Sequence, residues 1–164
     1  MSIGNFRDNV KELDLIIKRD GREHMLTCTM LEFSDKLIIH LSMNGETDIS
    51  YDIQIPEKND LKKPLRRYDF DEEKEQEELE NTIIPIVLIG SGNNMKMQVL
   101  SSQIGHTISQ LSNKNIILNI SGKLFGRAYL DEYRPGDSVL VQQCLHLATE
   151  TYQSQRPAAD VSPS

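Results

Sequence analysis

Four histidines are the side chains in this sequence best suited to bind a metal ion. They are His24, His40, His106 and His146. A second ligand on the same helical face would stand four residues away. Around His106 these positions hold Ser102 and Gln110, which are poor ligands. His146 is followed by Glu150, but a single half-site of this kind is more typical of a solvated surface pair. The spacing predicts no metal site.

A glycine-containing loop, Ile-Gly-Ser-Gly-Asn-Asn-Met at residues 89–95, is the feature most similar to a phosphate-binding loop. Backbone amides at Gly90 and Gly92, next to a helix N-terminus, could hold an anion. However, Met95 stands where a third glycine would be needed, and no Lys-Ser/Thr pair follows. The sequence therefore favours an ordinary turn in which Asn93 or Asn94 caps the next helix.

No arrangement of nucleophile and base is evident. Ser91, between two glycines, comes nearest to a nucleophile elbow, but no base is identifiable near it. Cys28 lies among apolar strand residues and Cys144 on the apolar face of a helix, so both are expected in the core. We predict a protein that is not an enzyme and needs no cofactor. An enzyme that uses the Gly90–Gly92 loop on a phosphorylated ligand is an alternative hypothesis, which the absence of a third glycine and of a Lys-Ser/Thr pair disfavours.

The charge of the 164-residue chain is concentrated in one segment. The net charge is −7, and the run Asp69–Glu80, with eight acids and one lysine, accounts for all of it. Residues 57–81 are predicted to form a charged, mobile insertion, because they have too few apolar groups to offset the entropy of ordering. The rest of the chain is neutral, Trp is absent and the aromatic residues are scattered, which argues against a nucleic-acid partner. No apolar run is long enough to cross a membrane.

The elements expected to carry these residues begin with a β-meander. Asp20-Gly21 and Asn44-Gly45 are hairpin turn signals. The expected strands cover residues 13–18, 24–33, 36–43, 48–55, 82–90 and 115–121, and the expected helices cover residues 97–113 and about 137–152, the latter capped by Asp137. The order ββββ-loop-βαβα predicts an α+β fold: a six-stranded, mainly antiparallel sheet with two helices packed on one face. We expect a single domain over residues 1–155 and a disordered tail over 156–164.

Two of the expected strands are apolar on both faces, although two helices can cover only one side of the sheet. Residues 83–89 are one example, and residues 36–43 are the other, with Ile38 and Met43 assigned to one side. Such a strand needs a second layer, which is expected to be another protein. The predicted partner interface consists of Leu37, Ile39, Leu41, Ile49, Tyr51 and Ile53. On this assignment, Ile39→Asp would abolish association.

Two stretches of the chain and its closing helix resemble the corresponding parts of a known protein family. One stretch is His-Met-Leu-Thr-Cys-Thr-Met-Leu-Glu-Phe-Ser-Asp-Lys-Leu-Ile-Ile-His-Leu-Ser-Met-Asn-Gly at residues 24–45. The other, residues 98–121, is an aliphatic helix followed by Ser-Asn-Lys-Asn and a strand that ends in Ser. The closing helix through Asp-Ser-Val-Leu-Val-Gln-Gln-Cys-Leu-His-Leu-Ala-Thr-Glu is similar in position and character. Together these segments resemble the proteasome assembly chaperone 4 family, whose fungal members act with a chaperone 3 partner of similar fold.

The resemblance implies a non-enzymatic chaperone that forms a heterodimer, sheet against sheet, and binds α-type subunits during assembly of the 20S proteasome α-ring. The alternative hypothesis is a longin- or profilin-like adaptor in a trafficking or GTPase complex. Two cysteines far apart in the sequence give no disulfide framework, which favours a reducing cytosolic or nuclear setting.

Overall fold

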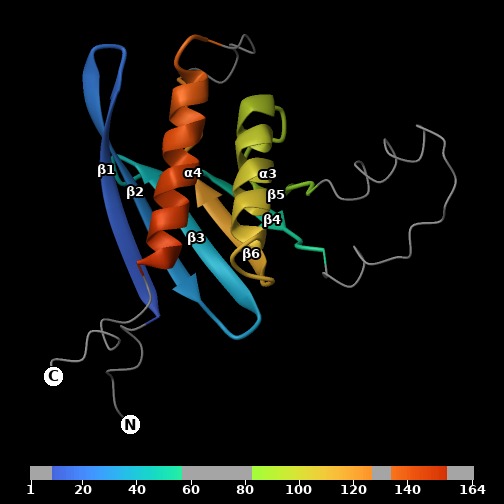
Figure 1. The fold of residues 1–164 in the computed structure, drawn as a ribbon. Helices are drawn as coiled ribbons and strands as arrows, with labels where there is room; N and C mark the ends of the chain where they lie inside the picture. Colours follow the sequence, from blue (N-terminus) through green and yellow to red (C-terminus); the bar gives the residue numbers. More distant parts are fainter. Residues whose placement is uncertain (1–8, 57–82, 127–133, 155–164) are drawn as a thin grey trace, which may run out of the picture.

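The computed structural model describes residues 9–56, 83–126 and 134–154. The elements are β1 (Val10–Arg19), β2 (Arg22–Glu32), β3 (Lys36–Met43), β4 (Ile49–Ile53), β5 (Ile86–Ile89), α3 (Met95–Ser109), β6 (Asn115–Ile120) and α4 (Asp137–Gln153). Six strands and two helices in this order confirm the predicted α+β class (Figure 1). The predicted insertion at 57–81 and the predicted tail at 156–164 lie outside the described residues.

Both dipeptide turn signals form tight turns, but in the described sheet Asp20-Gly21 alone joins two strands that pair with each other. Asp20 and Gly21 have φ angles of 52° and 73°, and Asn44 and Gly45 have φ angles of 53° and 81°. Positive φ at two successive positions gives the turn twist that matches antiparallel strands, and Gly, Asn and Asp tolerate it best. Asp20-Gly21 joins β1 to β2, which pair antiparallel. Asn44-Gly45 follows β3 and closes only the short bridge between Met43 and Glu46; the hairpin expected there does not form, because β6 lies between β3 and β4. β2 and β3 also pair antiparallel, and residues 33–35 join them.

The sheet order is β1-β2-β3-β6-β4-β5. β6 inserts between β3 and β4, running parallel to β3 and antiparallel to β4, so the sheet is mixed although mostly antiparallel. β5 occupies one edge, and Ile86, Leu88 and Ile89 are more than half exposed there. The apolar residues of β5 were expected to be covered on both faces of the sheet. In the structure β5 is an edge strand, and three of its apolar side chains are largely exposed.

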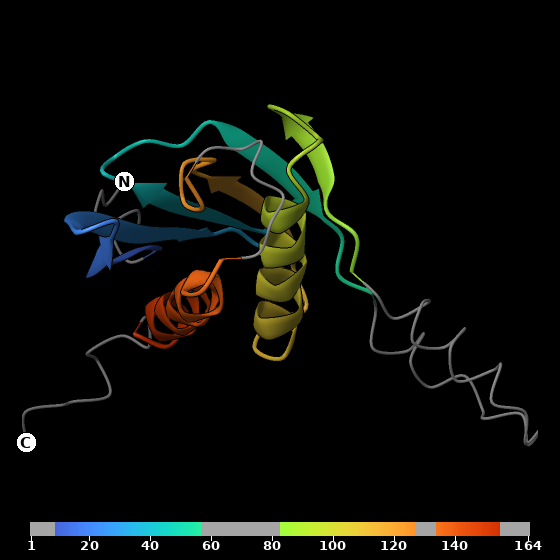
Figure 2. The same cartoon turned by 90° about the horizontal axis from the view of Figure 1, so that it is seen from above.

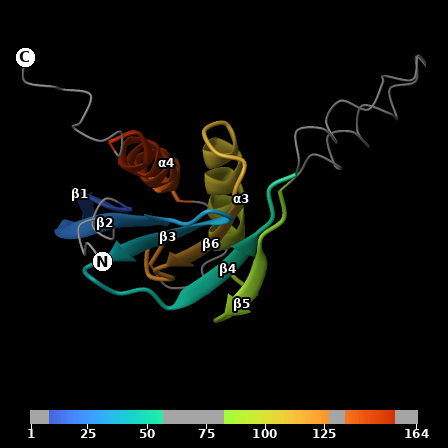
Figure 3. The same ribbon diagram turned by 90° about the horizontal axis from the view of Figure 1, so that it is seen from below.

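Both helices lie on the same side of the sheet, as Figures 2 and 3 show. Asn94, one of the two asparagines predicted to cap this helix, is the N-cap of α3. Its side chain accepts a hydrogen bond from the backbone amide of Met97 at 3.2 Å. The cap of α4 differs from the prediction. Gly136, with φ of 97°, precedes the helix, and Asp137 is its first residue. No described helix is both long and apolar enough to span a membrane.

The hydrophobic core fills the space between the helices and the sheet. Leu100, Ile104 and Ile108 project from α3 with no exposed surface, while Leu111 lies beyond the helix end and is 37% exposed. The facing sheet residues recur at every second position, and β3 and β4 each alternate strictly between buried and half-buried side chains after the first residue of β3. The core thus uses one face of the sheet.

Gly105 on α3 packs closely against Ile53 of β4 and against Ile83. A Cβ atom there would lie 2.9 Å from Cγ2 of Ile53 and 3.0 Å from Cγ2 of Ile83. We expect Gly105→Val to lower the free energy of unfolding by about 2 kcal/mol, because the overpacking outweighs the small gain in helix propensity. Urea denaturation measures the loss. Gln103→Val, at an exposed position of α3, is the control and should change stability by less than about 0.5 kcal/mol.

Candidate partner interface

The side of the sheet that no described helix covers is called the open face here (Figures 2 and 3). Because side chains alternate along a strand, each strand sends every second residue to this face. Paired residues on neighbouring strands line up into rows that cross the sheet. One row runs across all six strands and a second across five of them, and the two rows differ in chemistry.

The first row, named the Ile38 row, is apolar at all but one position. The strand pairings join Val10, Leu31, Ile38, Ile117, Asp52 and Ile86 in this order from β1 to β5. Leu31, Ile38 and Ile117 are half-buried by their neighbours alone, and Ile86 is 56% exposed. A monomer gains little from a continuous apolar row that faces solvent, whereas a bound partner would bury it.

The second row, named the His40 row, is polar and internally hydrogen-bonded. It joins Glu12, Thr29, His40, Asn119 and Ser50. Thr29 donates its hydroxyl to Oε2 of Glu12 at 2.8 Å, and Ser50 donates to Oδ1 of Asn119 at 2.5 Å. The amide of Asn119 lies 3.4 Å from Nε2 of His40. These bonds fix the side chains before any partner arrives.

Further apolar side chains extend the open face beyond the two rows. Ile16 and Met25 are paired across β1 and β2 and are 61% and 47% exposed. At the β5 edge, Leu88 and Ile89 are 53% and 65% exposed, and Ile89 pairs with Ser50 of the His40 row. The open face therefore has apolar areas on both sides of a polar band, which is typical of protein interfaces rather than of enzyme sites.

The six residues predicted at the interface lie on the opposite side. Leu37, Ile39, Leu41, Tyr51 and Ile53 have no exposed surface, and Ile49 is 6% exposed. All six belong to the core beneath α3 and α4, so in this fold no partner can contact them. Met43, expected beside Ile38, lies with them at 8% exposure, as its odd position along β3 requires. The correction moves the expected contact surface to the other face of the same strands.

The four histidines are distributed over the sheet and the helices, and each has a hydrogen-bonding partner. His24 contacts Asn44, and His40 contacts Asn119. His106 accepts from the amide of Ile83, and His146 pairs with Glu150 at 3.0 Å on the surface. Within the described ranges, no three His, Cys, Asp or Glu side chains are grouped closely enough to hold a metal ion.

The glycine loop between β5 and α3 uses its own polar groups to begin the helix. The carbonyl oxygen of Gly92 accepts from the side-chain amide of Gln98 at 2.6 Å. The amide of Asn93 donates to Oγ of Ser91 at 3.3 Å, so this hydroxyl is part of the turn. With the Met97 amide bound to Asn94, the loop acts as the predicted helix cap.

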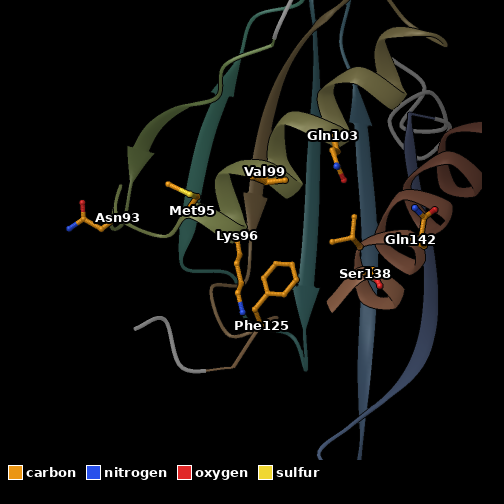
Figure 4. Close-up of a pocket in the computed structure, with 9 residues that line it drawn as sticks. Asn93, Met95, Lys96, Val99, Gln103, Phe125, Ser138 and Gln142 are labelled. Atoms are coloured by element: carbon orange, nitrogen blue, oxygen red, sulfur yellow. The ribbon is translucent and has the colours of Figure 1, made fainter. Parts of the chain in front are cut away.

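A pocket of about 450 Å³ lies between the first turns of α3 and α4, on the helix side of the molecule (Figure 4). Val99, Val141 and Phe125 supply much of its apolar lining. The one cationic residue in its lining, Lys96, already forms an ion pair and a cation–π contact. Its Nζ lies 2.9 Å from Oδ2 of Asp137 and 5.9 Å from the centre of the Phe125 ring. The pocket therefore offers an anion no unpaired charge.

Asp137 is a buried acid that the sequence analysis took for a helix cap. Its side chain is fully buried, with Oδ1 3.1 Å from Arg19 on β1 and Oδ2 2.9 Å from Lys96 on α3. The backbone amide of Arg134 also donates to it, at 2.8 Å. Burial acts to raise the pKa of Asp137, but the Arg134 amide, Lys96 and Arg19 together hold it below its usual value. This ionic cluster joins β1, α3 and α4 and is structural.

Both cysteines are free and buried, as predicted. Burial raises the pKa of the Cys28 thiol to about 11 and that of Cys144 to about 12. At neutral pH both are protonated and unreactive.

Most of the residues that make the open face apolar were not predicted from the sequence. Ile38 was placed correctly on the side opposite Ile39, but Leu31 and Ile117 were not considered. The signal that could have found them is the period-two alternation of β2 and β6, in which each strand places apolar residues at both odd and even positions.

Comparison with known proteins identifies the family. The sequence model of the family described as "20S proteasome chaperone assembly proteins 3 and 4" matches residues 1–139. A solved structure described as "Crystal Structure of a Novel Chaperone Complex for Yeast 20S Proteasome Assembly" has the same fold, with a TM-score of 0.62 and 16% sequence identity, over 87% of this chain and 98% of that one. A sequence search of curated proteins finds no significant match. The match over most of the chain establishes that this protein belongs to the family of 20S proteasome chaperone assembly proteins 3 and 4.

Proposed function

We propose that this proteasome assembly chaperone works by binding alone, as one half of a heterodimer. Its partner is a chaperone 3-type protein of similar fold, which packs sheet against sheet on the open face. The pair promotes assembly of the 20S α-ring by binding α-type subunits. The observation that carries the proposal is the Ile38 row, an apolar row that remains uncovered on the side opposite the helices.

The physical argument concerns the second layer that an apolar face requires. Burying apolar area contributes about 25 cal/mol per Å². Two sheets that pack face to face interdigitate their side chains across a layer about 10 Å thick. The open face offers Leu31, Ile38 and Ile117 at its centre, on the central strands of the sheet. A partner sheet of similar width would cover them. The sheet of each protomer would then be packed on both faces, against its own helices on one side and against the partner sheet on the other.

The reducing cytosol or the nucleus is the proposed place of this work. Cys28 and Cys144 are buried free thiols rather than a disulfide, a state that suits a reducing compartment. A longin- or profilin-like adaptor role has no support from the family match.

The test is co-expression of the chain with the chaperone 3-type protein of the same organism. Native mass spectrometry should give a one-to-one complex, and affinity purification from cells should retain α-type proteasome subunits identified by peptide mass spectrometry. The matched control is Glu150→Ala on the exposed side of α4, which should behave like the wild type. A folded chain that stays monomeric with its partner and retains no α-type subunit would contradict the proposal.

A further inference from the structure

The open face carries more acids than bases. Along its strands lie four acids and two lysines: Glu12, Asp14, Glu23, Asp52, Lys18 and Lys36. Elsewhere in the described part of the chain, buried or half-buried acids are paired with cations, as Asp137 is with Arg19 and Lys96. The excess on this face is therefore a local feature of the surface that a partner would meet.

Asp52 is the most informative of these acids, because it interrupts the Ile38 row. Its row neighbours are Ile117 on β6 and Ile86 on β5, and it is half-buried. The amide of Gln54 donates to Oδ1 at 3.0 Å and to Oδ2 at 3.1 Å, but brings no charge. Among the described residues no cation lies within ion-pair distance of this carboxylate. A sheet packed on the row would remove it from water, which is costly unless a cation accompanies it.

The His40 row adds to the excess of negative charge on the open face. The hydroxyl hydrogens of Thr29 and Ser50 are already donated, to Glu12 and to Asn119. The carboxylate of Glu12 lies at the end of the row and adds a negative charge to this face. Asp14 lies two residues farther along β1 on the same face. A complementary surface must therefore supply donors and positive charge.

We infer that the open face selects its partner by electrostatic complementarity. The partner sheet carries a basic side chain opposite Asp52 and further basic side chains opposite Glu12 and Asp14. This inference rests on the proposed function and specifies the chemistry of the partner. A second copy of this chain fits poorly, because it would bring a second set of the same acids into one interface. The acids thus favour the heterodimer over the homodimer by repulsion as well as attraction.

The test compares affinities for the co-expressed chaperone 3-type partner, measured by calorimetry at 50 and 300 mM NaCl. We expect the wild-type Kd to rise with salt. Asp52→Arg should raise Kd on the order of 100-fold, and Asp52→Asn about 10-fold with a weaker salt dependence. Glu150→Arg, which reverses one acid on the helix side, is the matched control and should leave Kd unchanged. Circular dichroism checks that each variant is folded.

The second arm measures self-association without a partner by light scattering. The variant E12Q/D14N/D52N should self-associate more than the wild type at equal concentration, because the repulsion is removed. A wild-type chain that forms a tight homodimer would overturn the inference, and so would a salt-insensitive heterodimer that tolerates Asp52→Arg. The latter result would leave the proposed function standing. Failure of the wild type to form any complex would contradict both.

Discussion

Ile38→Asp is expected to abolish association with the partner while the monomer stays folded, and Ile39→Asp is expected to unfold the monomer. The two residues are neighbours on β3 and point to opposite sides of the sheet. Ile38 is half-buried on the open face, where a new carboxylate can reach water. In the complex, the same carboxylate would be covered by an apolar layer, at a cost of several kcal/mol.

Ile39 has no exposed surface and packs under the helices. A carboxylate there loses its hydration with no cation to replace it, and the apolar contacts of the isoleucine are lost as well. The expected loss of more than about 4 kcal/mol is a large part of the 5–15 kcal/mol by which domains of this kind are stable.

Urea denaturation of each variant, followed by native mass spectrometry with the partner, separates the two effects. Ile38→Val, which keeps an apolar side chain on the open face, is the control and should bind with less than about tenfold loss. The assignment of faces would be reversed if Ile39→Asp folded but failed to associate while Ile38→Asp unfolded.

Asp137→Asn is expected to lower the free energy of unfolding by about 3–5 kcal/mol at pH 7. The substitution leaves Arg19 and Lys96, both largely buried, without a counter-charge. Glu46→Gln removes an acid from an ion pair with Lys123 that is mostly exposed, and should lower the stability far less, because water screens this pair. Urea titrations of both variants give the comparison, and equal losses would contradict a structural role for the buried cluster.

The loss in Asp137→Asn should depend on pH with a definite sign. Because the pKa of Asp137 is held below its unfolded value of about 3.9, the folded state binds fewer protons there than the unfolded chain does. The stabilisation is complete above that unfolded pKa and is lost as the pH falls through the folded pKa. The gap in stability between wild type and Asp137→Asn should therefore narrow below about pH 4. A gap that widened on acidification would contradict the assignment.

The local elements could be predicted because their signals are short-range. The Asn44-Gly45 turn and the alternation along β4 locate strands without reference to the rest of the chain, and Asn94 was one of two expected caps for α3. Asp137 was misassigned because Arg19 and Lys96, its partners, are 118 and 41 residues away in sequence. No local pattern reports contacts over such separations.

The sequence by itself determined the element order, the α+β class and the presence of apolar residues on both faces of β3. Only the tertiary structure decided which side the helices cover, and hence that Ile38 rather than Ile39 faces outward. Alternation with period two divides a strand into two sets of side chains but does not say which set is the core. That choice depends on where β6 inserts, between β3 and β4, and on which face α3 and α4 then pack. The position of β6 and the face that the helices cover depend on the total apolar surface that the whole domain buries, which no single segment determines.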